Sequence, residues 1–168
     1  MNPIIILTGP VHSGKTTLLK QWTASQKNAA GILTPVINDE RFFYDIQTGE
    51  SFPMNAAPDE KEILQVGRFN FSKTNFEKAA NIIIRSCDKK EFDHIVVDEI
   101  GPLELVQQKG FYDVLIFLLQ HLKKEQHLVL TVRDNCIAVI QDLLNSLQLK
   151  SRVYTKEEIA VAFPAHWS

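Results

Sequence analysis

The segment Gly9–Thr17 constrains the fold of this chain more than any other part of the sequence. It reads GPVHSGKTT, and its spacing fits G-x-x-x-x-G-K-[ST], the phosphate-binding loop pattern. The apolar run Ile4–Leu7 precedes it, and the helical pattern Leu18–Trp22 follows it. Strand, glycine-bounded loop and helix in this order are the context in which such a loop binds phosphate. A glycine turn that stands by chance before a lysine is therefore the weaker interpretation.

The residue types in this loop match the chemistry of a nucleotide-phosphate site. Glycines allow backbone N–H groups to turn toward phosphate oxygens, and the N-terminus of the following helix adds a positive dipole end. We expect Lys15 to contact the β- and γ-phosphates of a nucleotide and the Thr16 hydroxyl to bind Mg²⁺. The predicted phosphate-binding residues are Gly9, Pro10, Val11, His12, Ser13, Gly14, Lys15, Thr16 and Thr17.

Apolar runs alternate with helical patterns along the rest of the chain. Buried strands are predicted at residues 3–8, 94–99 and 128–132, and a short last strand at residues 152–154. Helices are predicted at residues 15–26, 74–87, 111–123 and 137–147. Because most of the strands are uninterrupted apolar runs, the predicted fold class is α/β, a mainly parallel sheet with helices on both faces. A length of 168 residues suits one domain, which we expect to span residues 1–168.

An antiparallel addition interrupts this alternation at about residues 31–70. The stretches 31–37 and 41–46 are predicted to form a β-hairpin, in which Pro35 favours an edge position. The aromatic run Phe42–Tyr44 either stacks on a nucleotide base or packs on the core.

Polar and capping residues mark the remaining boundaries. Residues 47–62 contain two prolines and a charged run, and we expect them to form a loop. Two capping boxes are predicted to begin helices: Thr74 with Glu77, and Thr155 with Glu158. The helix that follows the second box is expected to end at Pro164.

An acid pair, Asp98 and Glu99, ends one of the apolar strands. Carboxylates are costly at such a position unless they have a partner or a function. In a phosphate-loop protein the acid at this strand end commonly holds Mg²⁺, the role that we predict for Asp98. Glu99, one residue further, is expected to point to the opposite side of the strand and to act there as a general base or water positioner. A pair that caps the next turn is the alternative.

Thr131 and Arg133 stand at the end of the next strand. Thr131 is predicted to hydrogen-bond the attacking water or Glu99, and a core threonine is the alternative. Arg133 is predicted to bring positive charge to the γ-phosphate, a role equally open to three other arginines, Arg41, Arg68 and Arg152. Ligands of parallel sheets bind beyond the carboxyl ends of the strands. The loop, the acid pair and the Thr131–Arg133 segment are therefore expected to share one site.

Composition restricts the partners. The net charge is −2, from 18 basic and 20 acidic residues, so neither nucleic acid nor a membrane is expected as an obligatory partner. No apolar run approaches the roughly 18 residues of a membrane span. The two cysteines, Cys87 and Cys136, form no disulfide framework, which favours a reducing, cytoplasmic setting. The histidines and cysteines have no zinc-ligand spacing.

Several segments together resemble a known family. They are Leu7–Pro10, Gly14–Leu18, Gly31–Thr34, Val66–Phe69 and Val97–Leu105. The last reads VDEIGPLEL and looks like the signature D-E-I-G-x-[ML]-E-L. On these residues, most of the chain resembles the small THEP-type nucleoside-triphosphatases, also called the cancer-related nucleoside-triphosphatase family.

The resemblance implies a phosphate-loop NTPase with a RecA-like core. It also implies slow, Mg²⁺-dependent hydrolysis of ATP, GTP and other nucleoside triphosphates to diphosphate and phosphate. At the matching positions, the resemblance implies that Lys15 and Thr16 bind phosphate and metal, that Asp98 binds the metal, and that Glu99 acts as the base. The chain departs from the family pattern at His12, where a glycine is usual, and at Pro35, Phe43–Tyr44 and Pro102.

Three functions remain open from the sequence. A nucleoside-triphosphate hydrolase is favoured, because an acid follows the predicted metal ligand and no acceptor motif is evident. A small-molecule or nucleotide kinase would need arginines that converge on the transferred phosphate, whereas here they are scattered along the chain. A non-catalytic nucleotide switch is the third hypothesis. Neither a base preference nor an oligomeric state is indicated.

Overall fold

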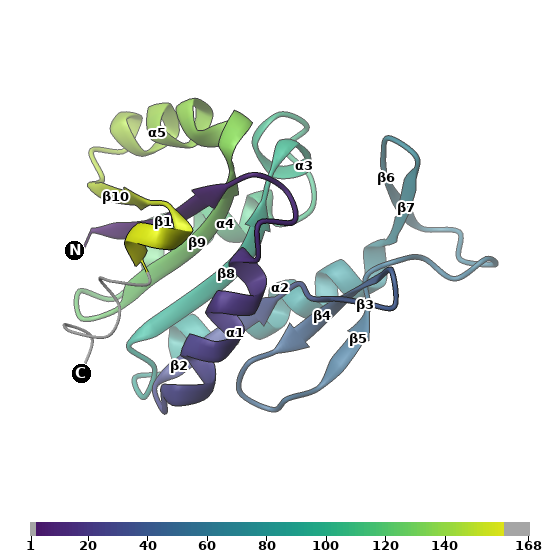
Figure 1. Ribbon diagram of the computed structural model, residues 1–168, viewed down its shortest axis with the longest axis horizontal. Helices are drawn as coiled ribbons and strands as arrows, with labels where there is room; N and C mark the ends of the chain where they lie inside the picture. Colours follow the sequence, from purple (N-terminus) through teal and green to yellow (C-terminus); the bar gives the residue numbers. More distant parts are fainter. Residues whose placement is uncertain (1–2, 160–168) are drawn as a thin grey trace.

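A mainly parallel sheet forms the centre of the fold (Figure 1). The computed structural model describes residues 3–159. Within this range the strands of the sheet are β1 (Ile4–Gly9), β2 (Ala29–Leu33), β3 (Val36–Ile37), β4 (Glu40–Asp45), β5 (Ser51–Pro53), β8 (His94–Ile100), β9 (His127–Arg133) and β10 (Ser151–Tyr154). Their spatial order is β10-β1-β9-β8-β2-β4-β3, with β5 paired to β4. Neighbours from β10 to β2 are parallel, and β3, β4 and β5 are antiparallel additions.

Helices connect the strands and cover the sheet. They are α1 (Lys15–Ser25), α2 (Lys73–Asp88), α3 (Pro102–Leu105), α4 (Tyr112–His121) and α5 (Ile137–Ser146), with a 3₁₀ turn, η1 (Asp134–Cys136), before α5. A separate hairpin of β6 (Ile63–Val66) and β7 (Phe69–Ser72) stands away from the sheet (Figure 1). The predicted fold class, an α/β fold with helices on both faces and an antiparallel hairpin, is confirmed.

The alternation of side chains along β1 explains why both faces are covered. Successive side chains of a strand point to opposite faces. Ile5 and Leu7 pack with α1 residues, whereas Ile4 and Ile6 belong to the larger core beneath α2, α4 and α5. An uninterrupted apolar run is therefore what a strand with two buried faces requires.

Gly31 permits the close contact between β2 and β8. A Cβ atom at this position would lie 2.1 Å from the carbonyl oxygen of Val96, and the φ angle of Gly31 is 121°. Any other residue would clash with the neighbouring strand and would adopt a strained backbone conformation.

The hairpin prediction is largely correct. β2 and β3 both pair with β4, and β3, which follows Pro35, lies at the edge of the sheet. The expectation of a loop over residues 47–62 is wrong in part, because Ser51–Pro53 forms β5 against β4. Phe43 is fully buried among core aromatics, so the core interpretation of this side chain is correct.

The two predicted capping boxes have different outcomes. The first is wrong, because α2 begins at Lys73 and its N-cap is Ser72, whose hydroxyl accepts a hydrogen bond from Asn75 N at 3.1 Å. Ser72 is the last residue of β7, so the N-cap lies two residues before Thr74, the N-cap that the sequence indicated. The second box forms as predicted, with Thr155 N donating to Glu158 Oε2 at 2.7 Å. The helix end predicted at Pro164 lies outside the described residues.

Two further findings concern the expectations about membrane spans and cysteines. In residues 3–159, no helix has the length and hydrophobicity that a bilayer span requires. Cys87 and Cys136 are both buried free thiols.

Candidate active site

One cavity of about 430 Å³ lies at the carboxyl ends of the central strands. The three polar segments singled out in the sequence all contribute to its lining, as predicted. The lining consists of residues 11–17, Lys20, residues 34–37, Arg41, Asp98, Glu99, Thr131 and Arg133. Gly9 and Pro10 are not among the lining residues, and neither are Arg68 and Arg152.

The loop between β1 and α1 adopts a conformation that needs glycine. Gly14 is the N-cap of α1 and has a left-handed backbone, with a φ angle of 84°. Its carbonyl accepts the first helical hydrogen bond, from Leu18 N at 3.0 Å. His12 also has a positive φ angle, 62°. A side chain other than glycine costs roughly 1 kcal/mol there, which explains physically why a glycine is usual at this position in the resembling family.

Lys15 folds back onto its own loop. Its ammonium donates to the carbonyl oxygens of Gly9 at 2.8 Å and Pro10 at 2.6 Å, and to Ser13 Oγ at 3.2 Å. Burial lowers the pKa of Lys15, and the nearby carboxylates of Asp98, Asp134 and Glu99 oppose this shift. The two predicted loop residues outside the cavity lining, Gly9 and Pro10, thus contact the lysine through their carbonyls.

Asp98 is the centre of a buried hydrogen-bond network at the end of β8. It is 1% exposed, and Thr16 Oγ1 donates to its Oδ2 at 2.7 Å. Thr34 donates to the same oxygen from its backbone N and from its hydroxyl, both at 3.0 Å. Thr131 Oγ1 donates to Oδ1. Hydrogen bonds from three threonines therefore satisfy a carboxylate that would otherwise be costly to bury.

Glu99 lies on the same side as Asp98, so the prediction that it points to the opposite side of β8 is wrong. The hydroxyl of Thr34 lies 3.0 Å from Asp98 Oδ2 and 3.2 Å from Glu99 Oε2, within reach of both carboxylates. The reason is the backbone: Glu99 has a φ angle of 65°, and the register between β8 and β9 shifts between Val97 and Ile100. Such a bulge redirects a side chain that regular pleating would turn away.

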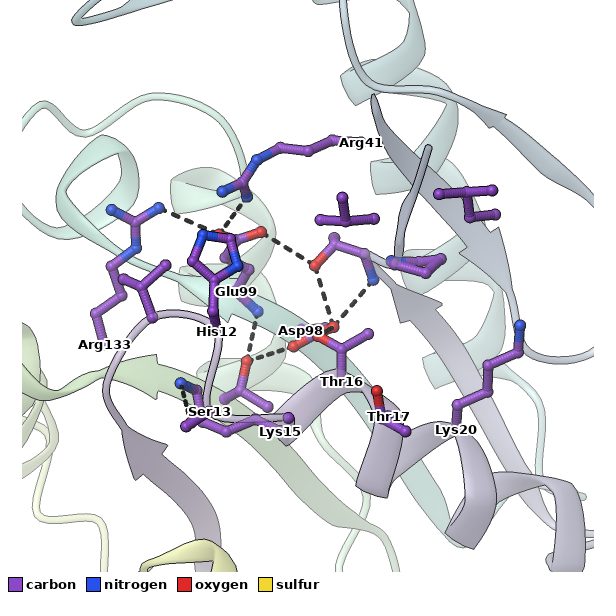
Figure 2. A pocket seen from close by; sticks show the side chains of 17 residues that line it. His12, Ser13, Lys15, Thr16, Thr17, Lys20, Arg41, Asp98, Glu99 and Arg133 are labelled. Carbon is purple, nitrogen blue, oxygen red and sulfur yellow. Dashed lines mark hydrogen bonds and ion pairs between the residues drawn. The ribbon is translucent and has the colours of Figure 1, made fainter. Parts of the chain in front are cut away.

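Two arginines hold the Glu99 carboxylate from different elements (Figure 2). Arg41 on β4 and Arg133 at the end of β9 both donate to Oε1, the latter at 3.1 Å. Of the candidate arginines, Arg133 and Arg41 line the cavity. Arg68 does not, and lies instead over the ring of Phe69.

Thr131 links the two carboxylates. Its hydroxyl accepts a hydrogen bond from Glu99 N at 2.6 Å and donates to Asp98 Oδ1. This is an interaction with the Glu99 backbone, not with its carboxylate. Thr131 is 1% exposed, so its hydroxyl also satisfies two polar groups that would otherwise be buried without partners.

The lining of the cavity carries an excess of positive charge. Four side chains, those of Lys15, Lys20, Arg41 and Arg133, are basic, and two, Asp98 and Glu99, are acidic. The N-terminus of α1 adds its dipole. The arrangement therefore favours an anionic ligand.

Sequence reasoning missed two parts of this site. The sequence predicted Thr34 as part of the family pattern and not as a contact of the acid pair, although it directly follows β2, the neighbour of β8. Lys20 lines the cavity one helical turn after Thr16, a spacing that could have indicated it.

A third carboxylate, Glu104 on α3, is buried behind Glu99. It is 3% exposed and accepts hydrogen bonds from Gly101 N at 3.0 Å and Phe111 N at 3.3 Å. Burial raises the pKa of Glu104 to about 7, although these hydrogen bonds oppose the shift. A second cavity, of about 50 Å³, is lined by both Glu99 and Glu104.

Glu104 is expected to make stability depend on pH. Because its pKa is raised in the folded state, the folded protein binds the proton more tightly than the unfolded chain does. Its contribution is present below about pH 4.5 and is lost as pH rises through about 7. The loss amounts to about 3 kcal/mol. Urea unfolding at pH 5 and pH 8 should show this fall in the wild type and a smaller one in Glu104→Gln. Equal falls in both proteins would contradict the prediction.

Comparison with known proteins places the chain in a family. A sequence profile of a family described as NTPase matches residues 4–159. The chain belongs to this NTPase family. The predicted family and enzyme class are thereby confirmed. The nucleoside-triphosphatase THEP1 of Thermotoga sp. (strain RQ2) is 29% identical to this NTPase-family chain over 147 residues, 84% of this chain and 80% of that protein. The Thermotoga petrophila THEP1 is 33% identical over 111 residues, 62% of this chain and 60% of that protein.

Two solved structures share the fold of this NTPase-family member. The solution structure of a human cancer-related nucleoside triphosphatase aligns with a TM-score of 0.68 at 20% identity, covering 99% of this chain and all of that one. The crystal structure of THEP1 from the hyperthermophile Aquifex aeolicus gives a TM-score of 0.69 at 22% identity, with 96% of this chain and 95% of that one covered.

Proposed function

We propose that this chain hydrolyses nucleoside triphosphates to diphosphate and phosphate in the presence of Mg²⁺. The observation that carries the proposal is the convergence of Lys15, Thr16, Asp98 and Glu99 on one positively charged cavity. Phosphoryl transfer needs mainly positioning and electrostatic stabilisation, which such a cavity supplies. Membership in the NTPase family supports the same reaction.

Thr16 and Asp98 would hold the metal. Their oxygens already lie 2.7 Å apart, with Asp98 buried and Thr16 half-buried, and the pair offers one hydroxyl and one carboxylate. This oxygen donor set fits Mg²⁺, which commonly takes one or two carboxylates and completes its shell with substrate phosphates and water. When bound, Mg²⁺ neutralises and orients the β- and γ-phosphates.

Glu99 would act as the general base toward the attacking water. In the structure its Oε1 accepts hydrogen bonds from two guanidinium groups, and the Thr34 hydroxyl lies 3.2 Å from its Oε2. These contacts occupy the carboxylate that would have to accept the proton from water. The negative charge of a γ-phosphate offers Arg41 and Arg133 another partner, so nucleotide binding would free Glu99 and bring the arginines to the charge that develops in the transition state. Thr131, through the backbone N of Glu99, would keep the base in place.

Phosphate release from ATP, GTP, CTP and UTP with Mg²⁺ tests the proposal. We expect slow turnover with all four, and Lys15→Ala should lower kcat/KM at least about a hundredfold, because it removes the charge expected to contact the β- and γ-phosphates. Lys27→Ala, an exposed lysine after α1, is the matched control and should be unchanged. Nucleotide binding without phosphate release would contradict hydrolysis. Consumption of the triphosphate that appears only with an added acceptor, and that phosphorylates the acceptor without releasing phosphate, would support a kinase instead.

A further inference from the structure

A second lysine approaches the phosphate loop from the far side of β1. A Cβ atom built on Gly14 would lie 3.0 Å from Lys156 Nζ and 3.7 Å from its Cε. Lys156 follows β10, which pairs with β1 on the side opposite β9 and β8 (Figure 1). It is not among the residues that line the cavity around Asp98 and Glu99. The two lysines therefore flank the loop from different directions.

The turn that carries Lys156 is anchored in the fold. Thr155 and Glu158 form a reciprocal capping box, with hydrogen bonds of 2.7 and 3.4 Å. Ile159, 1% exposed, packs in the small core around Leu19 and Trp22 of α1. The packing of Ile159 on α1 therefore fixes the position of the turn that carries Lys156.

Lys156 is exposed, and its charge lies at the end of α1 that is already positive. Lys156 stands beside the N-terminus of α1, where the helix dipole is positive, and Lys15 adds a second ammonium in the same loop. Within residues 3–159, no carboxylate forms an ion pair with Lys156. Cations normally stabilise helix C-termini and destabilise N-termini, so this placement indicates that an anion completes the site.

We infer that Lys156 binds the part of the nucleotide that remains as diphosphate after hydrolysis. The inference rests on the proposed function, which puts the γ-phosphate near Glu99 and Arg133. Lys156, which lies beside Gly14 at the N-terminus of α1, would contact the α- and β-phosphates. This contact is the same with triphosphate and diphosphate, so it contributes to binding and not to the chemical step.

Nucleotide binding by Lys156→Ala is the test. With a fluorescent ADP analogue and Mg²⁺, the dissociation constant should rise about tenfold, as expected for a lost charge-assisted contact. The KM for ATP should rise by the same factor, with kcat unchanged or raised if diphosphate release limits turnover. Lys156→Arg should recover most of the affinity. Lys124→Ala, an exposed lysine after α4, removes the same charge elsewhere and should have no effect.

Inorganic tripolyphosphate identifies the contacted group. Competition of tripolyphosphate with the fluorescent ADP should weaken by the same factor in Lys156→Ala. A loss with ATP and ADP but not with tripolyphosphate would assign Lys156 to the nucleoside and overturn the inference. Wild-type affinity in Lys156→Ala would overturn it while leaving the proposed hydrolysis intact. A wild-type chain that binds the nucleotide without hydrolysing it would instead refute the hydrolysis alone.

Discussion

Replacing Glu99 with glutamine is expected to lower kcat about a thousandfold while nucleotide binding stays within a few-fold of the wild type. Glutamine has nearly the shape of glutamate and still accepts hydrogen bonds from Arg41 and Arg133, so the cavity should keep its form. It cannot accept a proton from water at neutral pH. The loss should therefore fall on kcat and on kcat/KM equally, as for an interaction made in the transition state.

Single-turnover phosphate release, with the protein in saturating excess over ATP and with Mg²⁺ present, measures this effect without interference from product release. Glu77→Gln removes an equal charge from the exposed face of α2 and is the matched control. Turnover by Glu99→Gln within about threefold of the wild type would refute the general-base assignment. It would leave Glu99 as a partner that keeps the two arginines in position.

Replacing Asp98 with asparagine should abolish the response to Mg²⁺ and lower kcat/KM by about a thousandfold or more. The amide loses the negative charge that would hold the cation beside Thr16. It also disturbs a buried network, because Asp98 Oδ2 accepts from Thr34 N, a group that cannot reverse its role and accept. We therefore expect a stability cost of about 1–3 kcal/mol as well.

Magnesium titrations of activity, together with urea unfolding, separate these two effects. A folded Asp98→Asn protein with a normal Mg²⁺ dependence would contradict the metal assignment. Asp142→Asn, on the exposed side of α5, makes the same chemical change outside the site and should leave both measurements unchanged. If Asp98→Asn fails to fold, Thr16→Val tests the other predicted metal ligand without removing a charge.

Local patterns in the sequence were sufficient for the phosphate loop and for the sheet. Gly9, Gly14, Lys15 and Thr16 stand at fixed spacing between an apolar run and a helical pattern, and each requirement is local. The fold class followed from uninterrupted apolar runs, because a strand buried on both faces leaves no polar alternation. The same reasoning predicted one shared site, since parallel strands bring their carboxyl ends to one edge.

Tertiary structure decided the parts that depend on contacts across the chain. No local sequence pattern predicted the positive φ angle of Glu99, which turns its carboxylate toward Asp98. That conformation arises where the β8–β9 register shifts. Arg41 was one of four equivalent arginines until the β4 hairpin placed it on Glu99, 58 residues away in the chain. Lys156 reaches the loop through the packing of Ile159 on α1. Residue spacing in the sequence encodes a loop that binds its ligand through its own backbone. Side chains that meet from distant strands are instead positioned by the fold.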